Sequence, residues 1–297
     1  MSRINLIDRI NRGVFILDGA MGTQLMARGT EVWGCNDYLN IESPEIVGDI
    51  HAAYFQAGSD AVITNTFGAN KFALARHGKG GQVQEINFAG AQVARKAAGD
   101  NKYVLGDIGP CGDFLEPLGM IKTDELREAF AVQAKGQAAG GVDGFIIETM
   151  TALDEIVIAV EAVKSISDLP ILVSLAFDPA GGQFKTMMGT SPVDAVERLA
   201  SFGIAAVGFN CGTLDMAGYV NLSEVYTDAI GDKPIVLLAE PNAGRPELID
   251  SEAIYTLSPE DFAKAAEQIR SLGAGVIGGC CGTSPGHIKV MAETLKQ

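Results

Sequence analysis

The sequence predicts a single (β/α)8 barrel, in which eight parallel strands alternate with helices. Three observations predict it. Eight short apolar runs recur along the 297 residues, longer segments with helical periodicity separate them, and no linker or low-complexity tract divides the chain. A strand–helix alternation of this kind is typical of parallel α/β folds, and a barrel commonly occupies about 250 residues as one domain. We therefore expect residues 1–297 to form one domain.

The apolar runs are continuous rather than alternating, which indicates strands that are buried on both faces. They lie at 14–20, 60–67, 103–110, 144–150, 170–177, 205–212, 234–241 and 274–282. A doubly wound open sheet is the alternative arrangement. Eight evenly spaced units favour closure into a barrel.

The segments between the runs repeat their apolar residues about every 3.6 positions, as amphipathic helices do. They lie at 43–58, 83–99, 123–141, 152–166, 191–203 and 258–273. Several open on Ser or Thr followed by an acid and close on Gly, which are helix-capping signals. The pattern is least clear over 213–231. We expect 21–42 and 77–82 to form loops over the barrel ends.

Composition excludes several classes of function. The formal net charge is −15 and no run of Lys and Arg forms a basic patch, so nucleic acid is not an expected partner. No apolar stretch reaches the ~18 residues that span a bilayer, so no membrane association is expected. The N-terminus reads as a helix and lacks the features of a signal peptide. We expect a cytoplasmic protein.

The five cysteines are too few and too scattered for a disulfide framework, and three of them fall at strand ends. Cys211 ends the sixth run, and the adjacent Cys280 and Cys281 end the eighth. A closed barrel separates these runs by one strand and gathers its chemistry at the carboxyl ends of the strands. Three thiolates at one mouth suit zinc, which leaves a fourth position open in catalytic sites. The glycines at 278, 279 and 282 would let the backbone bend so that both neighbours reach one ion.

Other interpretations of the same residues have less support. A disulfide between Cys280 and Cys281 would be strained, and Cys35 and Cys111 read as core residues. Residues 282–286, GTSPG, match a hydrolase nucleophile elbow. The only His that follows is His287, three residues away, and the only acid is Glu293 near the terminus, so Ser284 with Pro285 reads instead as a helix start. Carboxylates at the strand ends could suggest a glycosidase, yet the chain has one Trp to offer as a sugar platform. No nucleotide-binding glycine motif is present.

Several segments together resemble the homocysteine S-methyltransferase family. They are ILDGAMGTQL, NDYLNIESPEIV, ITNTFGAN, GFNCG, EPNAG and GGCCGTSPGHI, in the same order and spacing over about residues 10–292. Within that family, residues 35–71 are most similar to the homocysteine-binding module of cobalamin-dependent methionine synthase.

The resemblance implies a zinc-dependent methyl transfer to the thiol of homocysteine, which gives methionine. Cys211, Cys280 and Cys281 would be the catalytic metal ligands, and the homocysteine sulfur would take the open position. The turn Asp18, Gly19, Ala20, Met21 would bind the amino-acid end of the substrate. Glu148 would bind its α-ammonium. Thr64, Asn65 and Asn242 would line the same pocket.

The sequence constrains the identity of the methyl donor less than that of the acceptor. The chain has only a near match, DIHAAY at 49–54, to the D-x-H-x-x-G signature of corrinoid-binding modules. We therefore expect methylcobalamin or another methyl-corrinoid carried by a separate partner protein. S-methylmethionine or a betaine-like donor is the alternative, as is a corrinoid-system demethylase that uses another methylated substrate. The non-enzymatic alternative is a structural zinc or thiol-binding barrel, which would need a fourth Cys or His at a strand end.

Overall fold

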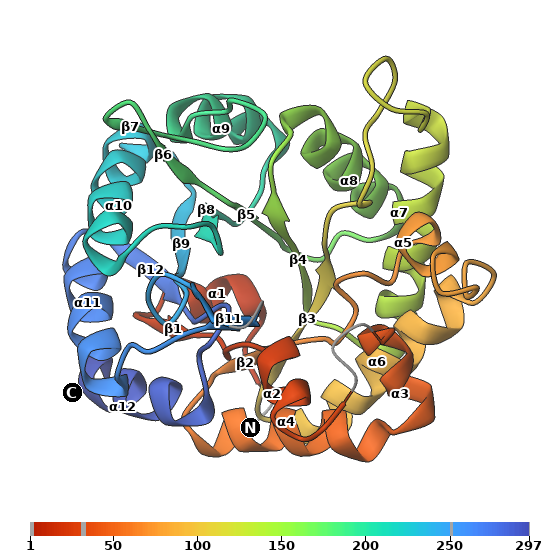
Figure 1. Cartoon of the computed structure of the whole chain (residues 1–297), viewed down its shortest axis with the longest axis horizontal. Helices are drawn as coiled ribbons and strands as arrows, with labels where there is room; N and C mark the ends of the chain where they lie inside the picture. The colour runs from red at the N-terminus through yellow and green to blue at the C-terminus, as the bar shows by residue number, and fades with distance from the viewer. Residues whose placement is uncertain (1–2, 31–33, 250–251, 297) are drawn as a thin grey trace.

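The structure is a computed structural model and describes residues 3–30, 34–249 and 252–296. It confirms the (β/α)8 barrel, with one parallel strand inside each of the eight apolar runs (Figure 1). The barrel strands are β1 (Phe15–Ile16), β2 (Ala61–Ile63), β3 (Tyr103–Ile108), β4 (Gly144–Met150), β5 (Ile171–Leu175), β8 (Ala206–Asn210), β9 (Val236–Glu240) and β12 (Ala274–Ile277).

The strands follow one another in the order β1-β12-β9-β8-β5-β4-β3-β2. The two ends of this order meet without a regular ladder. The backbone N–H of Asp60 donates to the Ile16 carbonyl at 2.7 Å, and the Asp60 carboxylate accepts the Ile16 N–H at 2.9 Å. Two residues past β1, the Asp18 carboxylate accepts the Ile63 N–H at 3.1 Å. Side chains therefore complete the closure between β1 and β2.

Eight helices surround the barrel, one after each strand (Figure 1). They are α4 (Pro44–Gln56), α6 (Val83–Ala98), α7 (Thr123–Gly140), α8 (Leu153–Ile166), α9 (Pro192–Leu199), α10 (Met216–Ile230), α11 (Pro259–Ser271) and α12 (Pro285–Leu295). Side chains cap several of them as the sequence indicates: Ser191 and Asp194 form a reciprocal capping box on α9, and Ser258 caps α11. The unclear segment 213–231 forms α10, which Asp215 caps. None of the helices in the described part of the chain has the length and apolar character to cross a membrane.

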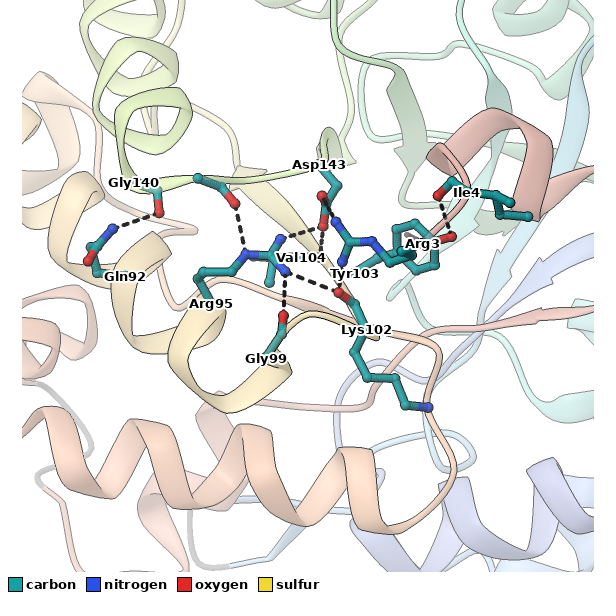
Figure 2. A network of polar contacts seen from close by, with 11 residues as sticks. Arg3, Ile4, Gln92, Arg95, Gly99, Lys102, Tyr103, Val104, Gly140 and Asp143 are labelled. Carbon is teal, nitrogen blue, oxygen red and sulfur yellow. Dashed lines mark hydrogen bonds and ion pairs between the residues drawn. The ribbon is translucent and has the colours of Figure 1, made fainter. Parts of the chain in front are cut away.

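The floor of the barrel is closed by the N-terminal segment and the helix α1 (Leu6–Ile10). Leu6 and Ile10 are buried in the same cluster as Phe15 and other barrel side chains. Figure 2 shows the contacts that anchor this end. The guanidinium groups of Arg3 and Arg95 both pair with Asp143, which precedes β4. These residues lie at the amino ends of the strands, far from the mouth.

Short additional elements vary the regular alternation, and most of them lie in the loops after the strands, at the mouth of the barrel. The region 21–42 contains α2 (Gly22–Met26), the 3-10 helix η1 (Asn36–Tyr38) and α3 (Leu39–Glu42), and α5 (Lys71–Ala75) follows β2. A 3-10 turn, η2 (Ala200–Phe202), extends α9. Two hairpins, β6 (Asp178–Ala180) with β7 (Gln183–Lys185) and β10 (Glu247–Ile249) with β11 (Glu252–Ile254), interrupt the loops after β5 and β9. No pattern in the sequence indicated these two hairpins.

Candidate metal centre

Three cysteine sulfurs meet at the mouth of the barrel. The Sγ atoms of Cys211 and Cys281 are 3.9 Å apart, those of Cys280 and Cys281 are 4.0 Å apart, and all three lie within 4.8 Å of one another. Tetrahedral zinc with Zn–S bonds of about 2.3 Å needs sulfurs roughly 3.8 Å apart. The donor set therefore fits a zinc ion. All five cysteines are free thiols, so the disulfide between neighbours is not formed.

Cys211, at the end of β8, has an unusual backbone conformation. Its φ is +53°, in the left-handed region that residues other than glycine rarely adopt. The Tyr219 hydroxyl donates to the Cys211 carbonyl at 2.6 Å. The Asn242 amide donates to the carbonyl of the next residue, Gly212, at 3.0 Å. These bonds fix the turn that presents the Cys211 sulfur.

The turn that carries Cys280 and Cys281 is fixed by its own backbone. The N–H of Cys280 donates to Pro241 and the carbonyl of Cys281 accepts the N–H of Ala243, each at 2.9 Å. The loop after β9 therefore pairs with the turn after β12. The Thr283 hydroxyl donates to the Cys280 carbonyl at 2.6 Å. The two adjacent thiols thus project from a braced loop rather than from a flexible one.

The glycines around the pair have two different roles. Gly282 has a φ of +78°, and a Cβ there would lie 2.2 Å from Cγ of Tyr255. Gly278 and Gly279 do not have positive φ. A Cβ on Gly279 would lie 2.6 Å from Cγ2 of Thr283, and one on Gly278 would lie 2.7 Å from Cβ of Leu17. Only one of the three glycines expected to permit a bend therefore does so; the other two permit close packing.

The three cysteine thiols differ in their pKa. Hydrogen bonds from Cys211 and Cys280 lower the pKa of Cys281 to about 3. The same contacts with Cys211 and Cys281, together with burial, raise the pKa of Cys280. The cluster therefore stabilises a thiolate at Cys281, which is the form that binds metal.

A cavity of about 520 Å³ lies in front of the sulfurs. Its lining includes the three cysteines and seven of the eight predicted substrate-binding residues: Asp18, Gly19, Ala20, Met21, Thr64, Asn65 and Glu148. Asn242 is not among the residues that line it. Its side chain is fully buried and donates to the Gly212 carbonyl, next to Cys211. Seven of the eight predicted residues therefore line one cavity, and Asn242 does not.

Four carboxyl groups converge on this end of the barrel. Burial raises the pKa of Asp18, Asp107 and Glu240 well above their usual values, and the charge of Glu148 adds to the rise in each. Burial raises the pKa of Glu148 to about 8, and the nearby Cys281 adds to that shift. In the part of the chain that the structure describes, no Lys, Arg or His forms an ion pair with any of the four. A positively charged ligand would stabilise the ionised forms of these carboxyl groups, so this end of the barrel is suited to bind one.

The turn from Asp18 to Met21 is tied to the cysteine loop. The N–H of Ala20 donates to the Thr283 hydroxyl at 3.0 Å, and the Tyr54 hydroxyl donates to the Ala20 carbonyl at 2.8 Å. A Cβ on Gly19 would lie 2.5 Å from the Thr283 hydroxyl oxygen. The Ala20 amide is therefore already engaged, and the cavity wall and the cysteine turn form one braced unit.

Thr64 and Asn65 also hold neighbouring segments. The Thr64 hydroxyl oxygen accepts the Asp107 N–H at 2.9 Å, which links β2 to β3 at the mouth. The Asn65 amide donates to the Asn36 carbonyl at 2.7 Å and so anchors the loop that contains η1. Both side chains are largely buried.

One residue of the site was missed. Asn210, the last residue of β8, is fully buried and contacts Thr149, Glu148 and Cys280 with one side-chain nitrogen. Its position at a strand end beside a cysteine was visible in the sequence. Its contacts with residues 61 to 70 positions away were not.

The histidines and the serine of the GTSPG segment lie outside the sulfur cluster. Ser284 is the N-cap of α12, and its hydroxyl lies 2.9 Å from Nδ1 of His287, whose Nε2 lies 2.9 Å from the Leu257 carbonyl. This pair is a helix cap and lacks the acid that a hydrolase triad needs. His51 is fully buried in α4, and His77 lies at the edge of the cavity.

Known proteins match this chain along most of its length. A family model described as homocysteine S-methyltransferase matches residues 15–295. Methionine synthases of Mycobacterium tuberculosis and Mycobacterium leprae are 33% and 32% identical to this chain over 98% of its length. The matched region is 25% of each of those proteins, so the chain spans about a quarter of their length.

Solved structures share the fold. The metallated form of the homocysteine methyltransferase MmuM from Escherichia coli superimposes with a TM-score of 0.79 at 22% identity, covering 96% of this chain and 98% of that one. A methyltransferase from Methanosarcina mazei gives a TM-score of 0.60 at 10% identity, with 96% and 94% coverage. At these identities the likeness shows the barrel alone.

Proposed function

Because the chain belongs to the homocysteine S-methyltransferase family, we propose that it transfers a methyl group to the sulfur of homocysteine and so forms methionine. The chain is a methyltransferase by its family. The observation that carries the choice of acceptor is one cavity lined by both a three-sulfur cluster and the partly buried carboxyl group of Glu148. Such a cavity offers separate partners for a thiol and for an ammonium group.

Cys211, Cys280 and Cys281 would hold a zinc ion. Their sulfur separations of 3.9 and 4.0 Å support this role, since tetrahedral zinc needs nearly the same spacing. When bound, zinc would keep the acceptor thiol deprotonated at neutral pH while leaving it a lone pair for the methyl group. Among the described residues, the metal-binding group consists of these three cysteines with no fourth Cys, His, Asp or Glu. Three ligands support an open, reactive site over the structural zinc barrel.

The carboxyl groups would orient the amino-acid end of the acceptor. Glu148 lies within reach of the same Asn210 nitrogen as the Cys280 sulfur, so both ends of a short aminothiol could be held at once. An α-ammonium beside Glu148 would stabilise its carboxylate form and lower its pKa. Asp18 lines the same cavity, and the ammonium would also favour the ionised form of this carboxyl group, whose pKa burial raises. Holding the substrate at both ends would fix the sulfur in the direction of methyl transfer.

We propose that the methyl donor is a corrinoid carried by another domain or protein. The methionine synthases it matches are about four times longer than this chain, which leaves room in them for further modules. The near match to the corrinoid signature at 49–54 does not supply such a site, since His51 is buried within α4. Residues 1–297 would then be one homocysteine-binding domain that receives the methyl group at its mouth.

A methyl-transfer assay tests this function. The purified, zinc-loaded chain is incubated with homocysteine and, in parallel, with methylcobalamin, S-methylmethionine or betaine, and methionine is quantified. Methionine formed from methylcobalamin above the protein-free rate supports the proposal. Methionine formed only from S-methylmethionine or betaine would keep the acceptor and replace the donor. No methionine from any donor would contradict the proposed function.

A further inference from the structure

One carboxamide links three parts of the cavity wall. The Asn210 Nδ2 donates to the Thr149 hydroxyl at 2.7 Å and lies 3.5 Å from Oε2 of Glu148 and 3.6 Å from the Cys280 sulfur. Its Oδ1 accepts the Thr149 N–H at 2.8 Å and the Ser174 hydroxyl at 2.9 Å. The side chain is fully buried, so water does not compete for these contacts.

The contact with Thr149 maintains a bulge in β4. The register between β4 and β5 moves from Ile147 opposite Val173 to Met150 opposite Leu175, which places one extra residue on β4. Thr149 has a φ of +57°, a rare conformation for a β-branched residue. In a regular strand, consecutive side chains point to opposite faces. Here both Glu148 and Thr149 line the cavity, so the bulge directs Glu148 toward the sulfurs.

The other contacts of Asn210 reach the metal-binding sulfurs. Asn210 precedes Cys211 directly, and its N–H group points at the Cys280 sulfur across the barrel mouth. Groups that hydrogen-bond to metal ligands orient them and tune the metal. A single rigid side chain therefore contacts the carboxyl group at one end of the proposed acceptor site and a sulfur at the other.

We propose that Asn210 is a positioning residue that sets the distance between Glu148 and the sulfur cluster, and that this distance selects the length of the acceptor. The inference rests on the proposed function. Homocysteine and cysteine carry the same ammonium, carboxylate and thiol groups, but cysteine has one methylene less between them. A fixed spacing lets homocysteine reach both Glu148 and the sulfur cluster. Cysteine is too short to reach both, so it loses one of the two contacts. One methylene is worth about 10- to 200-fold in selectivity where the site is rigid.

Two variants separate the contacts of Asn210. Asn210→Asp keeps an oxygen acceptor for the Thr149 N–H, and its second oxygen can accept from the Thr149 hydroxyl in place of the lost N–H donor, so the bulge in β4 is retained. It replaces the N–H group that faces Glu148 and Cys280 with a charged oxygen, which repels both. Asn210→Ala removes every contact. Ser174→Ala is the matched control, because it removes a buried hydrogen bond to the same carboxamide but leaves the contacts with Thr149, Glu148 and Cys280.

The experiment measures kcat/KM for homocysteine and for cysteine with the same methyl donor, and the affinity of each aminothiol by calorimetry. We expect Asn210→Asp and Asn210→Ala to lower the homocysteine-to-cysteine ratio at least about tenfold, and Ser174→Ala to leave it within about threefold of the unmodified chain. The visible spectrum of the cobalt-substituted protein supplies a second readout. Loss of the N–H contact to Cys280 should move the sulfur-to-cobalt absorption to longer wavelength in the Asn210 variants alone.

The outcomes distinguish this inference from the proposed function. An unmodified chain that methylates neither aminothiol contradicts the proposed function. An active chain whose Asn210→Asp variant folds, as its thermal midpoint shows, and keeps both the acceptor ratio and the cobalt spectrum contradicts the role of Asn210 alone. A Ser174→Ala variant that lowers the ratio as much as Asn210→Asp also contradicts it, because the effect would then follow from any loss of buried hydrogen bonding.

Discussion

Thr149 and Cys211 share a left-handed backbone conformation, with φ of 57° and 53°, and Asn210 adjoins both of them. They are the only residues other than glycine with positive φ in the part of the chain that the structure describes. Such a conformation costs on the order of 1–3 kcal/mol and persists only where the surroundings enforce it. Here a buried carboxamide holds Thr149, while the bonds to the Cys211 and Gly212 carbonyls hold the second turn. The strain is located where the cavity meets the sulfurs.

Replacing Cys280 should abolish metal binding. Two thiolates hold zinc far more weakly than three, so Cys280→Ala should retain less than a tenth of the zinc of the unmodified chain, which should hold about one equivalent. Elemental analysis of freshly purified protein measures this. Cys111→Ser is the control, because Cys111 is buried away from the cavity and should not affect zinc content. If Cys280→Ala and the unmodified chain contain equal amounts of zinc, the cysteine cluster is not the metal site.

Glu148→Gln should weaken binding of homocysteine. The amide keeps the size of the side chain but loses the charge that would pair with the α-ammonium, a contact worth about 1.5–3 kcal/mol. Steady-state kinetics should give a KM for homocysteine about 10- to 100-fold higher, with a smaller change in the KM for the methyl donor. Glu161→Gln, on the outer surface of α8, should leave both constants unchanged. A normal KM for homocysteine in Glu148→Gln would exclude this carboxylate as the ammonium partner.

Gly282→Ala should destabilise the protein and disrupt the cysteine turn. The new Cβ would meet the Tyr255 ring at 2.2 Å, and alanine tolerates the φ of +78° poorly. We expect the free energy of unfolding to fall by about 3 kcal/mol and the zinc content to fall with it. Gly81→Ala is the control, since a Cβ at Gly81 meets nothing within 4 Å. Urea denaturation compares the two, and equal stabilities would show that Tyr255 yields without cost.

His51 should make the protein sensitive to acid. Burial lowers its pKa from 6.5 to about 3, and neither ring nitrogen has a hydrogen-bond partner among the residues that the structure describes. Between these values the unfolded chain binds a proton that the folded chain excludes, so stability falls as pH falls below about 6.5. At pH 5 this histidine should cost about 2 kcal/mol relative to pH 7 and above.

A substitution isolates this contribution from that of the carboxyl groups, whose raised pKa values act in the opposite direction. His51→Leu removes the titrating group but keeps an apolar side chain. The loss of unfolding free energy between pH 7 and pH 5 should be about 2 kcal/mol smaller in His51→Leu than in the unmodified chain. An identical loss in both proteins would mean that His51 is protonated without cost in the folded state.

Asp143→Asn should destabilise the fold without affecting the site. Asp143 pairs with both Arg3 and Arg95 at the floor of the barrel (Figure 2), and its loss leaves two partly buried guanidinium groups unpaired. We expect about 2 kcal/mol lower stability in urea denaturation. Asp124→Asn, which breaks an exposed pair with Arg127, should change stability by less than about 0.5 kcal/mol. Zinc content and the KM for homocysteine should be unchanged in both, and a coupled loss of zinc would show that the two ends of the barrel are not independent.

The barrel could be predicted because its evidence is local. Each strand is a continuous apolar run and each helix repeats its apolar face, so neighbouring residues suffice. The gathering of Cys211 with Cys280 and Cys281 also followed, since it needs only the rule that the carboxyl ends of strands meet. The helix α10 was harder to predict because its N-terminal signal is Asp215 alone.

The remaining parts depend on contacts between distant residues. The bulged Thr149 is hydrogen-bonded to Asn210, 61 positions later, and no pattern near Thr149 indicates this contact. Gly278 and Gly279 were expected to bend the chain, but the packing of Leu17 and Thr283 decides their role. Asn242 was expected to face the pocket because it follows a strand, yet the turn after Pro241 directs its side chain to Gly212. These details follow from how the loops pack, which a single sequence does not specify.

Asp18 both lines the cavity and helps to close the barrel, so a substitution there changes two properties at once. One carboxylate oxygen accepts the Ile63 N–H and joins the edges of β1 and β2, while the other has no partner in the described part of the chain. Any substitution at Asp18 would alter the ligand cavity and the closure of the barrel together. Lost activity in such a variant would therefore not distinguish weaker ligand binding from a weakened closure of the barrel. The Ile63 amide proton, in contrast, offers a spectroscopic reporter of events in the cavity, because its only acceptor there is a residue of the cavity wall.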